Sequence, residues 1–378
     1  MRLLMLSGDR QSCAGEKGPF WHLQREFSRH FERIDVLTPP PGRPVTVRTL
    51  FDNVHLHPAE CSRAKLVRHL ARRGEELVAE HGASLIVSHD YGWFYNGLAA
   101  ARVARRTGVP YLSEIHHVPG FPVAESWRER FERRIARAYV RWARTRARAF
   151  RVVNSNEMPA LLERWGVPRA QIAVIPSLYI DLETFRPATP PPEPEQDVCF
   201  VGRLVENKGL LRLVDALAAL DERGRPLRAL IVGKGPLRKA LEERVAKRKL
   251  AERVRFVEWV ESTAELAALY RASRLVVCAS TCEGGPRFTV EAMACGTPVV
   301  STPVGVMSEL LEDGSAGRLV GFDVASLADG LQALLDDEPA RRRAGLAAHE
   351  RVQRFEYAGA IRFYADELKR LAGAGESA

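Results

Sequence analysis

Short apolar runs alternate with longer stretches of helical periodicity along almost the whole chain. Residues 3–6, 85–88, 227–232 and 275–279 are runs of the length of buried strands, and each precedes a stretch with apolar residues three or four positions apart. The alternation recurs in both halves of the chain, without an internal repeat of short period. It predicts an α/β fold, in which helices cover parallel sheets.

The chain is long enough to build two hydrophobic cores. Its 378 residues exceed the size of one ordinary domain. A proline-rich segment, R-P-A-T-P-P-P-E-P-E-Q at residues 186–196, divides it, because prolines stiffen the backbone and forbid a helix. We therefore expect an N-terminal domain over residues 1–185, a linker at 186–196 and a C-terminal domain over 197–355.

The composition is that of a globular protein in a reducing compartment. Hydrophobic residues make up 46% and charged residues 27%, and no apolar run approaches the ~20 residues that a membrane span needs. The start, M-R-L-L-M-L-S-G-D, is too short and too soon polar for a signal peptide. The cysteines are scattered without a C-x-x-C pair, which favours buried free thiols over a metal site: Cys13, Cys61, Cys199, Cys278, Cys282 and Cys295. We expect a cytoplasmic protein.

Arginine dominates the formal net charge of +9, which favours anionic partners. No zinc-finger spacing or RNA-binding aromatic signature supports nucleic acid. Arginines are densest in a predicted helix over residues 127–148, whose apolar residues form one stripe: Trp127, Phe131, Ile135, Tyr139 and Trp142. Two interpretations stay open. The helix either docks on the sheet with a solvated basic face, or offers a surface to anionic lipid headgroups at the inner face of a membrane.

Two glutamates follow the predicted strand at residues 275–279. Pro286 suits the first turn of the next helix, and Gly296 suits its end. Glu283 thus stands in the loop at the carboxyl end of a strand, where open parallel sheets bind ligands, and Glu291 stands inside the helix. On spacing alone, two solvated carboxylates are an equally good interpretation.

The sequence around these glutamates resembles that of a known family. The stretch E-G-G-P-R-F-T-V-E-A-M-A-C-G-T-P-V-V at residues 283–300 is similar to the E-x7-E signature of retaining glycosyltransferases with the GT-B fold, in particular glycosyltransferase family four. The matching positions are Glu283, Gly284, Glu291, Ala292, Met293, Ala294, Gly296, Pro298, Val299 and Val300. The resemblance implies two Rossmann-like domains facing across a cleft. It also implies that the last helix, within residues 356–378, crosses back to the N-terminal domain.

A second motif in the C-terminal half supports the resemblance. The string G-R-L-V-E-N-K-G, which begins at Gly202, resembles the family's G-R-L-x-x-x-K-G motif, whose Arg and Lys hold the nucleotide diphosphate. Arg203 and Lys208 would then stabilise the charge that the departing diphosphate gains, typically the largest catalytic contribution. By the same resemblance, Gly233 in the turn G-K-G-P and Val260 would border the nucleotide.

Two segments of the N-terminal half also resemble the family. A glycine-bearing loop with Lys17 and Gly18 separates the first strand from a helix predicted over residues 20–31, an arrangement that binds anions. The segment Y-L-S-E-I-H-H-V-P-G resembles one whose histidine lies beside the donor sugar, and His116 aligns with that histidine. His117 stands where the family often has aspartate. The crossover at residues 173–187 departs from the family's V-I-P-N-G pattern.

The resemblance implies retaining glycosyl transfer without a metal or cofactor, from a nucleotide-diphosphate sugar to a hydroxyl of a lipid, a lipid-linked glycan or a sugar phosphate. Glu283 would contact the sugar's hydroxyls, Glu291 the ribose hydroxyls, and His116 the sugar from the other domain. Free N–H groups of the turn would add to the diphosphate site, which includes Gly285, Pro286, Arg287 and Phe288. The arginine is unusual there. It suggests an acidic sugar or an acceptor phosphate, or else it points to solvent.

Other functions on the same fold remain as alternatives. A nucleotide-sugar epimerase would use the same donor, and a sugar phosphorylase would need a pyridoxal-binding lysine for which no motif is present. A non-catalytic sugar-nucleotide-binding protein would be expected to lose Arg203, Lys208 or Glu291, and all three are present. We therefore expect a glycosyltransferase of cell-envelope glycan synthesis, with the base, the sugar and the acceptor left open.

Overall fold

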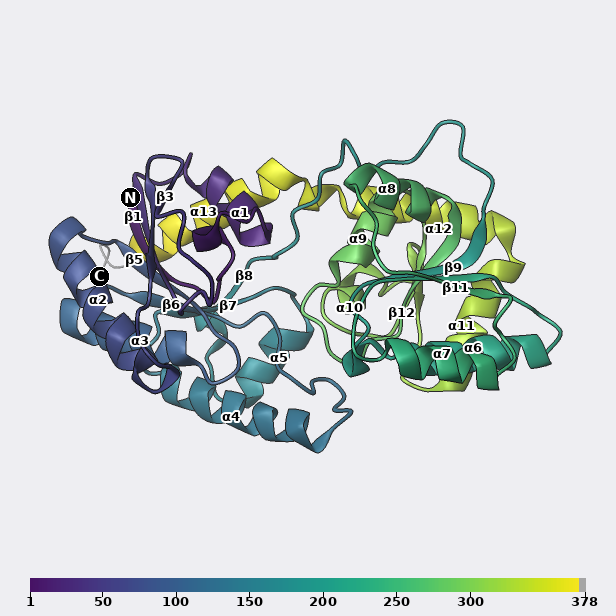
Figure 1. Ribbon diagram of the computed structural model, residues 1–378, viewed down its shortest axis with the longest axis horizontal. Helices are drawn as coiled ribbons and strands as arrows, with labels where there is room; N and C mark the ends of the chain where they lie inside the picture. Colours follow the sequence, from purple (N-terminus) through teal and green to yellow (C-terminus); the bar gives the residue numbers. More distant parts are fainter. Residues whose placement is uncertain (374–378) are drawn as a thin grey trace.

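The computed structural model describes residues 1–373, which form two α/β domains arranged along the long axis of the molecule (Figure 1). Each domain contains one sheet of mainly parallel strands with helices on both faces. The predicted α/β class with two Rossmann-like domains is confirmed. Among these residues, no helix is both long and apolar enough to cross a bilayer.

The first sheet has the strand order β3-β4-β2-β1-β5-β6-β7-β8. Its pairs are parallel, as in Leu3 opposite Ile34 and Leu85, except for the short antiparallel pair β3–β4 at one edge. The strands are β1 (Arg2–Leu6), β2 (Arg33–Thr38), β3 (Thr49–Leu50), β4 (Val54–Pro58), β5 (Leu85–His89), β6 (Tyr111–Glu114), β7 (Ala149–Val152) and β8 (Ile172–Val174). The helices of this part are α1 (Pro19–Phe27), α2 (Leu66–His81), α3 (Tyr95–Thr107), α4 (Trp127–Ala143) and α5 (Glu157–Arg164).

The second sheet is parallel throughout, in the order β11-β10-β9-β12-β13-β14. Its strands are β9 (Gln196–Val201), β10 (Ala229–Val232), β11 (Val254–Val257), β12 (Ser273–Cys278), β13 (Val299–Ser301) and β14 (Gly317–Leu319). Its helices are α6 (Leu210–Glu222), α7 (Arg238–Lys247), α8 (Thr263–Arg271), α9 (Arg287–Ala294), α10 (Met307–Leu310), α11 (Val324–Asp336) and α12 (Glu338–Arg351). In Figure 1, α8, α9 and α12 lie on one side of this sheet, and α6, α7 and α11 on the other.

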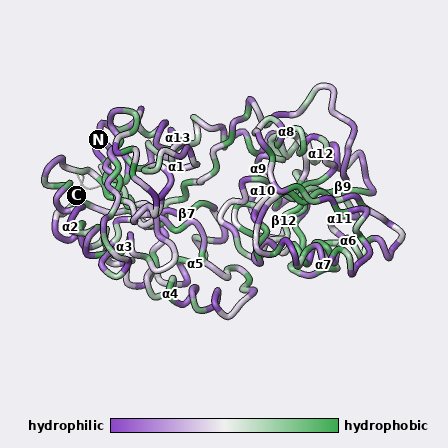
Figure 2. The backbone as a smooth tube through the Cα atoms, in the orientation of Figure 1, coloured by the Kyte–Doolittle hydropathy of each residue, from purple (hydrophilic) through white to green (hydrophobic). Residues whose placement is uncertain are grey.

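Burial on both faces explains why the central strands are continuously apolar. Leu275, Val276 and Val277 of β12 are fully buried, and Figure 2 shows hydrophobic residues gathered in the sheet of this domain. In the first domain, α2 to α5 pack on one face and α1 on the other. The last helix, α13 (Tyr357–Gly373), adds Ile361 and Tyr364 to that second face. The chain therefore returns to the first domain, as the resemblance implied.

Several predicted boundaries are wrong, and the causes are contacts with distant residues. Helix α1 ends at Phe27 instead of Phe31, where the Asn53 amide donates to the carbonyls of Ser28 (2.8 Å) and Phe31 (2.9 Å). The strand predicted at residues 227–232 begins two residues later, as β10 at Ala229, and the Arg228 N–H before it donates to Asp197 Oδ2 (2.8 Å).

The basic helix α4 differs from its prediction in length and in packing. It ends at Ala143 instead of continuing to residue 148. Only the second half of its apolar stripe docks on the domain, since Tyr139 is buried whereas Trp127 is 77% and Phe131 47% exposed. The start of this helix therefore presents aromatic surface to solvent.

The two domains are in direct contact through loops at the ends of their strands. The Val123 N–H donates to the Thr281 carbonyl (3.3 Å), and the Cys282 thiol to the Val118 carbonyl (3.2 Å). Nearby, the Gly305 N–H donates to Glu157 Oε2 (2.5 Å). The cleft between the domains is thus closed along one side.

Candidate active site

Glu283 lies where the sequence predicted, in the loop between β12 and α9. Its Oε1 accepts hydrogen bonds from Lys208 Nζ and from Ser280 Oγ (2.9 Å), and the side chain is only 13% exposed. Lys208 reaches it from the loop between β9 and α6. Glu283 Oε2 has no hydrogen-bonding partner within residues 1–373, which leaves that oxygen free to accept from a ligand.

Glu291 is held inside the second domain by two donors. Its Oε1 accepts from Arg287 Nε (2.7 Å) and its Oε2 from the Tyr270 hydroxyl (3.2 Å). Burial raises the pKa of Glu291, and the charge of Arg287 partly offsets that rise. From the sequence, Arg287 was expected either to face an anionic ligand or to point to solvent, and neither interpretation included its ion pair with Glu291. About half of the Arg287 side chain stays exposed.

Two glycine loops meet beside the end of β9. A Cβ atom on Gly233 would lie 1.8 Å from the Gly202 carbonyl oxygen, and the φ angles of both residues, 144° and 153°, are ones that side chains avoid. Arg203 follows directly, and its exposed side chain makes no hydrogen bond or ion pair to any other described residue. Val260, beyond β11, is half-buried.

The start of α9 carries unpaired backbone donors. The N–H groups of Gly285 and Phe288 have no acceptor within the described residues. Pro286 stands at the N-cap position, one residue before the helix, instead of in its first turn as predicted. The helix start therefore points free donors, and the positive end of its dipole, toward an anionic ligand.

The first domain contributes His116, directly after β6. A Cβ on Gly284 would lie 2.5 Å from the His116 carbonyl oxygen, so the absence of a side chain there lets the two domains meet beside the site. His116 Nε2 is 3.7 Å from Glu114 Oε2. Next to it, His117 keeps exposed surface; partial burial and the charge of His116 lower the pKa of His117, while Glu283 of the other domain opposes that shift and Lys208 adds to it.

A buried ionic network supports His116, and its members were missed by the sequence analysis. Glu114 Oε1 accepts from Arg151 Nη1 (3.1 Å) and from the Tyr364 hydroxyl, and Glu114 Oε2 lies 3.2 Å from His89 Nε2. Burial alone would raise the pKa of Glu114, but the charges of Arg151 and His89 hold it well below its usual range. Burial lowers the pKa of His89 to about 4. One signal was available: Glu114 and Arg151 are opposite charges at paired positions of neighbouring apolar strands.

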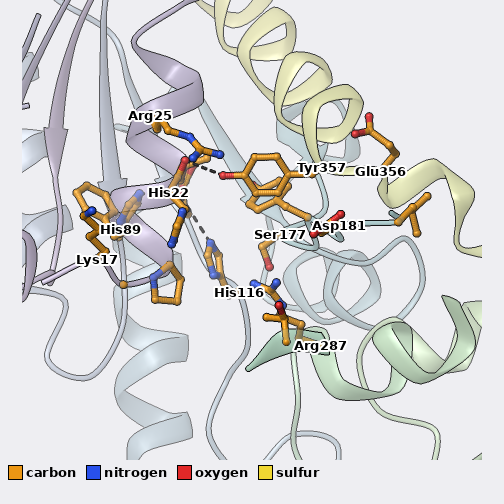
Figure 3. A pocket seen from close by; sticks show the side chains of 18 of the residues that line it. Lys17, His22, Arg25, His89, His116, Ser177, Asp181, Arg287, Glu356 and Tyr357 are labelled. Carbon is orange, nitrogen blue, oxygen red and sulfur yellow. Dashed lines mark hydrogen bonds and ion pairs between the residues drawn. The ribbon is translucent and has the colours of Figure 1, made fainter. Parts of the chain in front are cut away.

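A cavity of about 900 Å³ opens between the domains beside His116 (Figure 3). Of the predicted site residues, His116, Gly18 and Arg287 line it, whereas Glu283, Glu291, Arg203 and Lys208 do not. The remaining lining residues come from α1 and the loop before it, β5, β6, β7, the crossover segment, and the starts of α8 and α13. They include Lys17, His22, Arg25, His89, Glu114, Arg151, Ser177, Tyr179, Asp181 and Tyr357.

The cations of this cavity gather around one histidine. Partial burial lowers the pKa of His22, and so do the positive charges of Arg25, Arg287 and Lys17. Arg25 and Lys17 belong to the first domain and Arg287 to the second, so both domains contribute to one electropositive corner. Arg25 also pairs with Glu26 (3.3 Å) and Arg287 with Glu291 (2.7 Å), whereas Lys17 has no carboxylate partner within residues 1–373.

No arrangement suited to a metal ion is found in residues 1–373, where no three His, Cys, Asp or Glu side chains gather in a suitable way. All six cysteines are free, and five of them are buried. Burial raises the pKa of Cys282 and of Cys295 to about 12, so these thiols are uncharged.

Comparison with known proteins gives the family. Residues 20–177 match the family described as "Glycosyl transferase 4-like domain", and residues 181–351 match "Glycosyl transferases group 1". The chain is 36% identical to the D-inositol 3-phosphate glycosyltransferase of Nocardia farcinica over 243 residues, which are 58% of this chain and 53% of that protein. It is 30% identical to the 2-deoxystreptamine glucosyltransferase of Streptomyces kanamyceticus over 272 residues, 68% of this chain and 69% of that one. The matched region thus spans about half of the first relative and two thirds of the second.

Solved structures agree in fold over the full length. Sucrose-phosphate synthase from Thermosynechococcus elongatus is 25% identical and superposes with a TM-score of 0.78, covering 99% of both chains. Anabaena HepE in complex with UDP and glucose is 21% identical, with a TM-score of 0.73 over 98% of this chain and 100% of that chain. With both halves matched by the family and a relative covered over two thirds of its length, the chain belongs to the group 1 glycosyl transferases, which have the GT-B fold.

Proposed function

We propose that this protein is a retaining glycosyltransferase that moves a sugar from a nucleotide-diphosphate sugar to a hydroxyl acceptor without a metal ion. The observation that carries the proposal is the Lys208–Glu283 pair at the end of the second sheet, with His116 presented from the other domain. A cation and a carboxylate with one free oxygen are suited to hold a diphosphate and a sugar hydroxyl side by side. Family membership adds independent support.

The second domain provides what the donor needs. Lys208 and Arg203, with the free N–H groups of Gly285 and Phe288, would hold the diphosphate. Glu283 would accept from the sugar's hydroxyls through Oε2. Glu291 would accept from the ribose through the lone pairs that Arg287 and Tyr270 leave unused, since each carboxylate oxygen can accept about two hydrogen bonds.

The chemistry needs charge stabilisation more than a dedicated base. In the proposed step the bond between the anomeric carbon and the diphosphate oxygen breaks, and the acceptor oxygen bonds to the same face of the sugar. The acceptor's proton passes to the departing diphosphate oxygen. Fixed cations lower the barrier because the negative charge on that oxygen is largest in the transition state.

We propose an anionic acceptor, specifically a sugar or cyclitol phosphate, either free or carried on a lipid. The support is the electropositive corner of Lys17, Arg25 and Arg287 around His22, which lies in the cavity that His116 also lines. The Nocardia farcinica relative is named for an inositol phosphate, and another relative, from Mycobacterium leprae, is a phosphatidyl-myo-inositol mannosyltransferase. An acceptor of this kind fits envelope glycan or glycolipid synthesis in the cytoplasm.

The donor is tested first by thermal unfolding with UDP, GDP, ADP and their sugars. A ligand that binds only the native state at a hundred times its Kd adds about 2.7 kcal/mol and raises the Tm. The matching donor is then incubated with inositol phosphates and hexose phosphates, and the anomeric coupling of the product is read by proton NMR. We expect the donor's anomeric configuration to be kept. An inverted product would contradict the retaining mechanism, and an epimerised donor without transfer would identify an epimerase.

A further inference from the structure

A surface pocket of about 490 Å³ between α4 and α5 is lined by arginines over an apolar floor. We call it the arginine pocket; its residues are Phe121, Arg130, Arg133, Arg134, Arg137, Leu161, Arg164 and Trp165. Each of the four arginines of α4 has another of them three or four positions away, so they share one face of the helix. None of them lines the cavity between the domains.

The charges of the arginine pocket are not neutralised by the protein. The guanidinium groups of Arg130, Arg134 and Arg137 have no hydrogen bond or ion pair within residues 1–373. Arg133 donates only to the Gly120 carbonyl (3.0 Å), and no carboxylate lines the pocket. Elsewhere on the same helix Arg128 does pair with Glu132 (3.1 Å). Guanidinium groups held together without a counter-charge form a site for phosphate, which they bind in bidentate geometry.

Apolar surface adjoins these charges. Leu161 and Trp165 form the buried floor, and the guanidinium of Arg164 stacks over the Phe121 ring at 5.6 Å. At the start of α4, Trp127 and Phe131 are the exposed aromatic residues described above. Exposed aromatic rings beside basic side chains are typical of helices that lie in the interface of a membrane.

We propose that the arginine pocket and the exposed start of α4 bind the headgroups of an anionic phospholipid bilayer. This contact does not require the proposed transfer reaction, although it would serve it. The loop between β6 and α4 leads from His116 through Phe121 to Val123, which contacts the second domain at Thr281. The same loop therefore connects the arginine pocket to the candidate active site.

A lipid surface fits these residues better than a nucleic acid does. Single-stranded nucleic acids bind along grooves where successive bases stack on exposed aromatic rings. Here the ring beneath the arginines, Trp165, is only 8% exposed, and the exposed rings stand at the end of the helix. The charged pocket and the exposed aromatic residues are thus adjacent but separate. The pocket is suited to lipid headgroups, and the aromatic residues are suited to acyl chains.

The test is flotation of the full-length protein with vesicles of phosphatidylglycerol and phosphatidylcholine, compared with phosphatidylcholine alone. The pocket variant carries Arg130→Gln, Arg134→Gln, Arg137→Gln and Arg164→Gln. The control variant carries Arg102→Gln, Arg105→Gln, Arg343→Gln and Arg362→Gln, which are exposed arginines on other helices without a paired carboxylate. Both variants lower the formal net charge from +9 to +5, so they differ only in where the charge is lost.

We expect the wild type and the control to float with anionic vesicles but not with phosphatidylcholine alone. Because each arginine near an anionic surface contributes about a fivefold factor, the pocket variant should bind at least about a hundredfold more weakly. Salt at 1 M should release the wild type, since the Debye length falls to about 3 Å. Both variants should keep the wild-type Tm and donor-dependent transfer to a soluble acceptor.

Three outcomes would overturn the proposal. The wild type could remain unbound at low salt, the control could lose binding as much as the pocket variant, or fluorescence anisotropy could show binding to an oligonucleotide with none to vesicles. None of these results tests the transfer reaction, so failure of the membrane proposal would leave the proposed function unaffected.

Discussion

The charged side chains of the candidate donor site are of two kinds, those that form an ion pair and those that do not. Lys208 and Glu283 neutralise each other and their side chains are both 13% exposed, whereas the exposed guanidinium of Arg203 has no hydrogen bond or ion pair among the described residues. A bound diphosphate would therefore meet one cation already engaged and one that is free. The two cations of the same motif should respond differently to substitution.

Arg203→Ala should lower kcat about a hundredfold with little change in KM, because its charge is needed most when the diphosphate departs. Its Tm should equal that of the wild type. Lys208→Ala should lower kcat similarly and also lower the Tm, since it leaves the half-buried Glu283 without its counter-charge. Steady-state kinetics and thermal unfolding check both, with Arg255→Ala, an exposed cation of β11, as the control. Near-normal turnover in a folded Arg203→Ala variant would contradict the assignment.

Motif resemblance could propose candidate site residues that stand in short contiguous strings, but not buried residues that meet from distant parts of the chain. Glu283, Lys208 and Glu291 stand in contiguous, recognisable strings. Glu114, Arg151 and Tyr364 meet from two strands and a helix far apart in sequence, and Tyr270 reads as an ordinary apolar-face residue of α8. Only the paired register of β6 and β7 shows that the opposite charges touch.

The ends of helices and strands were predicted well where residues close in sequence determine them. The strand predicted at residues 85–88 is β5, longer by one residue, and Gly296 follows α9 with a φ of 79°, as expected of a glycine that ends a helix. Elements that end at distant partners were misjudged, as α1 was at Asn53. Helix α4 shows a third case, because its docking depends on a buried polar anchor that no periodicity reveals.

That anchor is Asp90, which accepts hydrogen bonds from Ser88 (2.6 Å), Ser113 (2.5 Å) and the Tyr139 hydroxyl of α4 (2.7 Å). Burial raises the pKa of Asp90 to about 7 from its usual 3.8. The folded state therefore binds this proton more tightly than the unfolded chain does. The contribution of Asp90 to stability is fully present below about pH 4 and is lost as pH rises through 7.

Tyr139→Phe should lower the free energy of unfolding by roughly 1 kcal/mol at pH 5 and by 1.5–3 kcal/mol at pH 8, because a hydrogen bond to an ionised group is worth more. Urea unfolding at the two pH values measures the difference. Tyr91→Phe, at an exposed tyrosine, is the control. An equal loss at both pH values would show that Asp90 does not change its charge in this range.

At the scale of the whole molecule, two carboxylates join the domains with opposite dependence on pH. Glu157 Oε2 accepts from the Gly305 N–H, and its Oε1 has no hydrogen-bonding partner within residues 1–373. Burial raises the pKa of Glu157 to about 7. Glu309 Oε2 accepts from the Ser155 hydroxyl (2.5 Å), and its Oε1 pairs with Arg354. Burial would raise the pKa of Glu309, but these donors lower it overall.

The domain contact should therefore weaken as pH rises from about 4.5 to about 7, because closure holds a proton on Glu157 that the open form releases. Glu157→Gln keeps an oxygen for the Gly305 N–H and removes the ionisation, so it should strengthen closure above pH 7 and change little at pH 5. Glu309→Gln should do the reverse, weakening closure at neutral pH with a smaller effect in acid, since its carboxylate is stabilised when ionised. Hydrogen exchange in the contact loop at residues 279–285, followed from pH 5 to pH 8 and corrected for intrinsic rates, measures how far the domains separate. Identical pH profiles for the wild type and Glu157→Gln would show that closure does not depend on this proton.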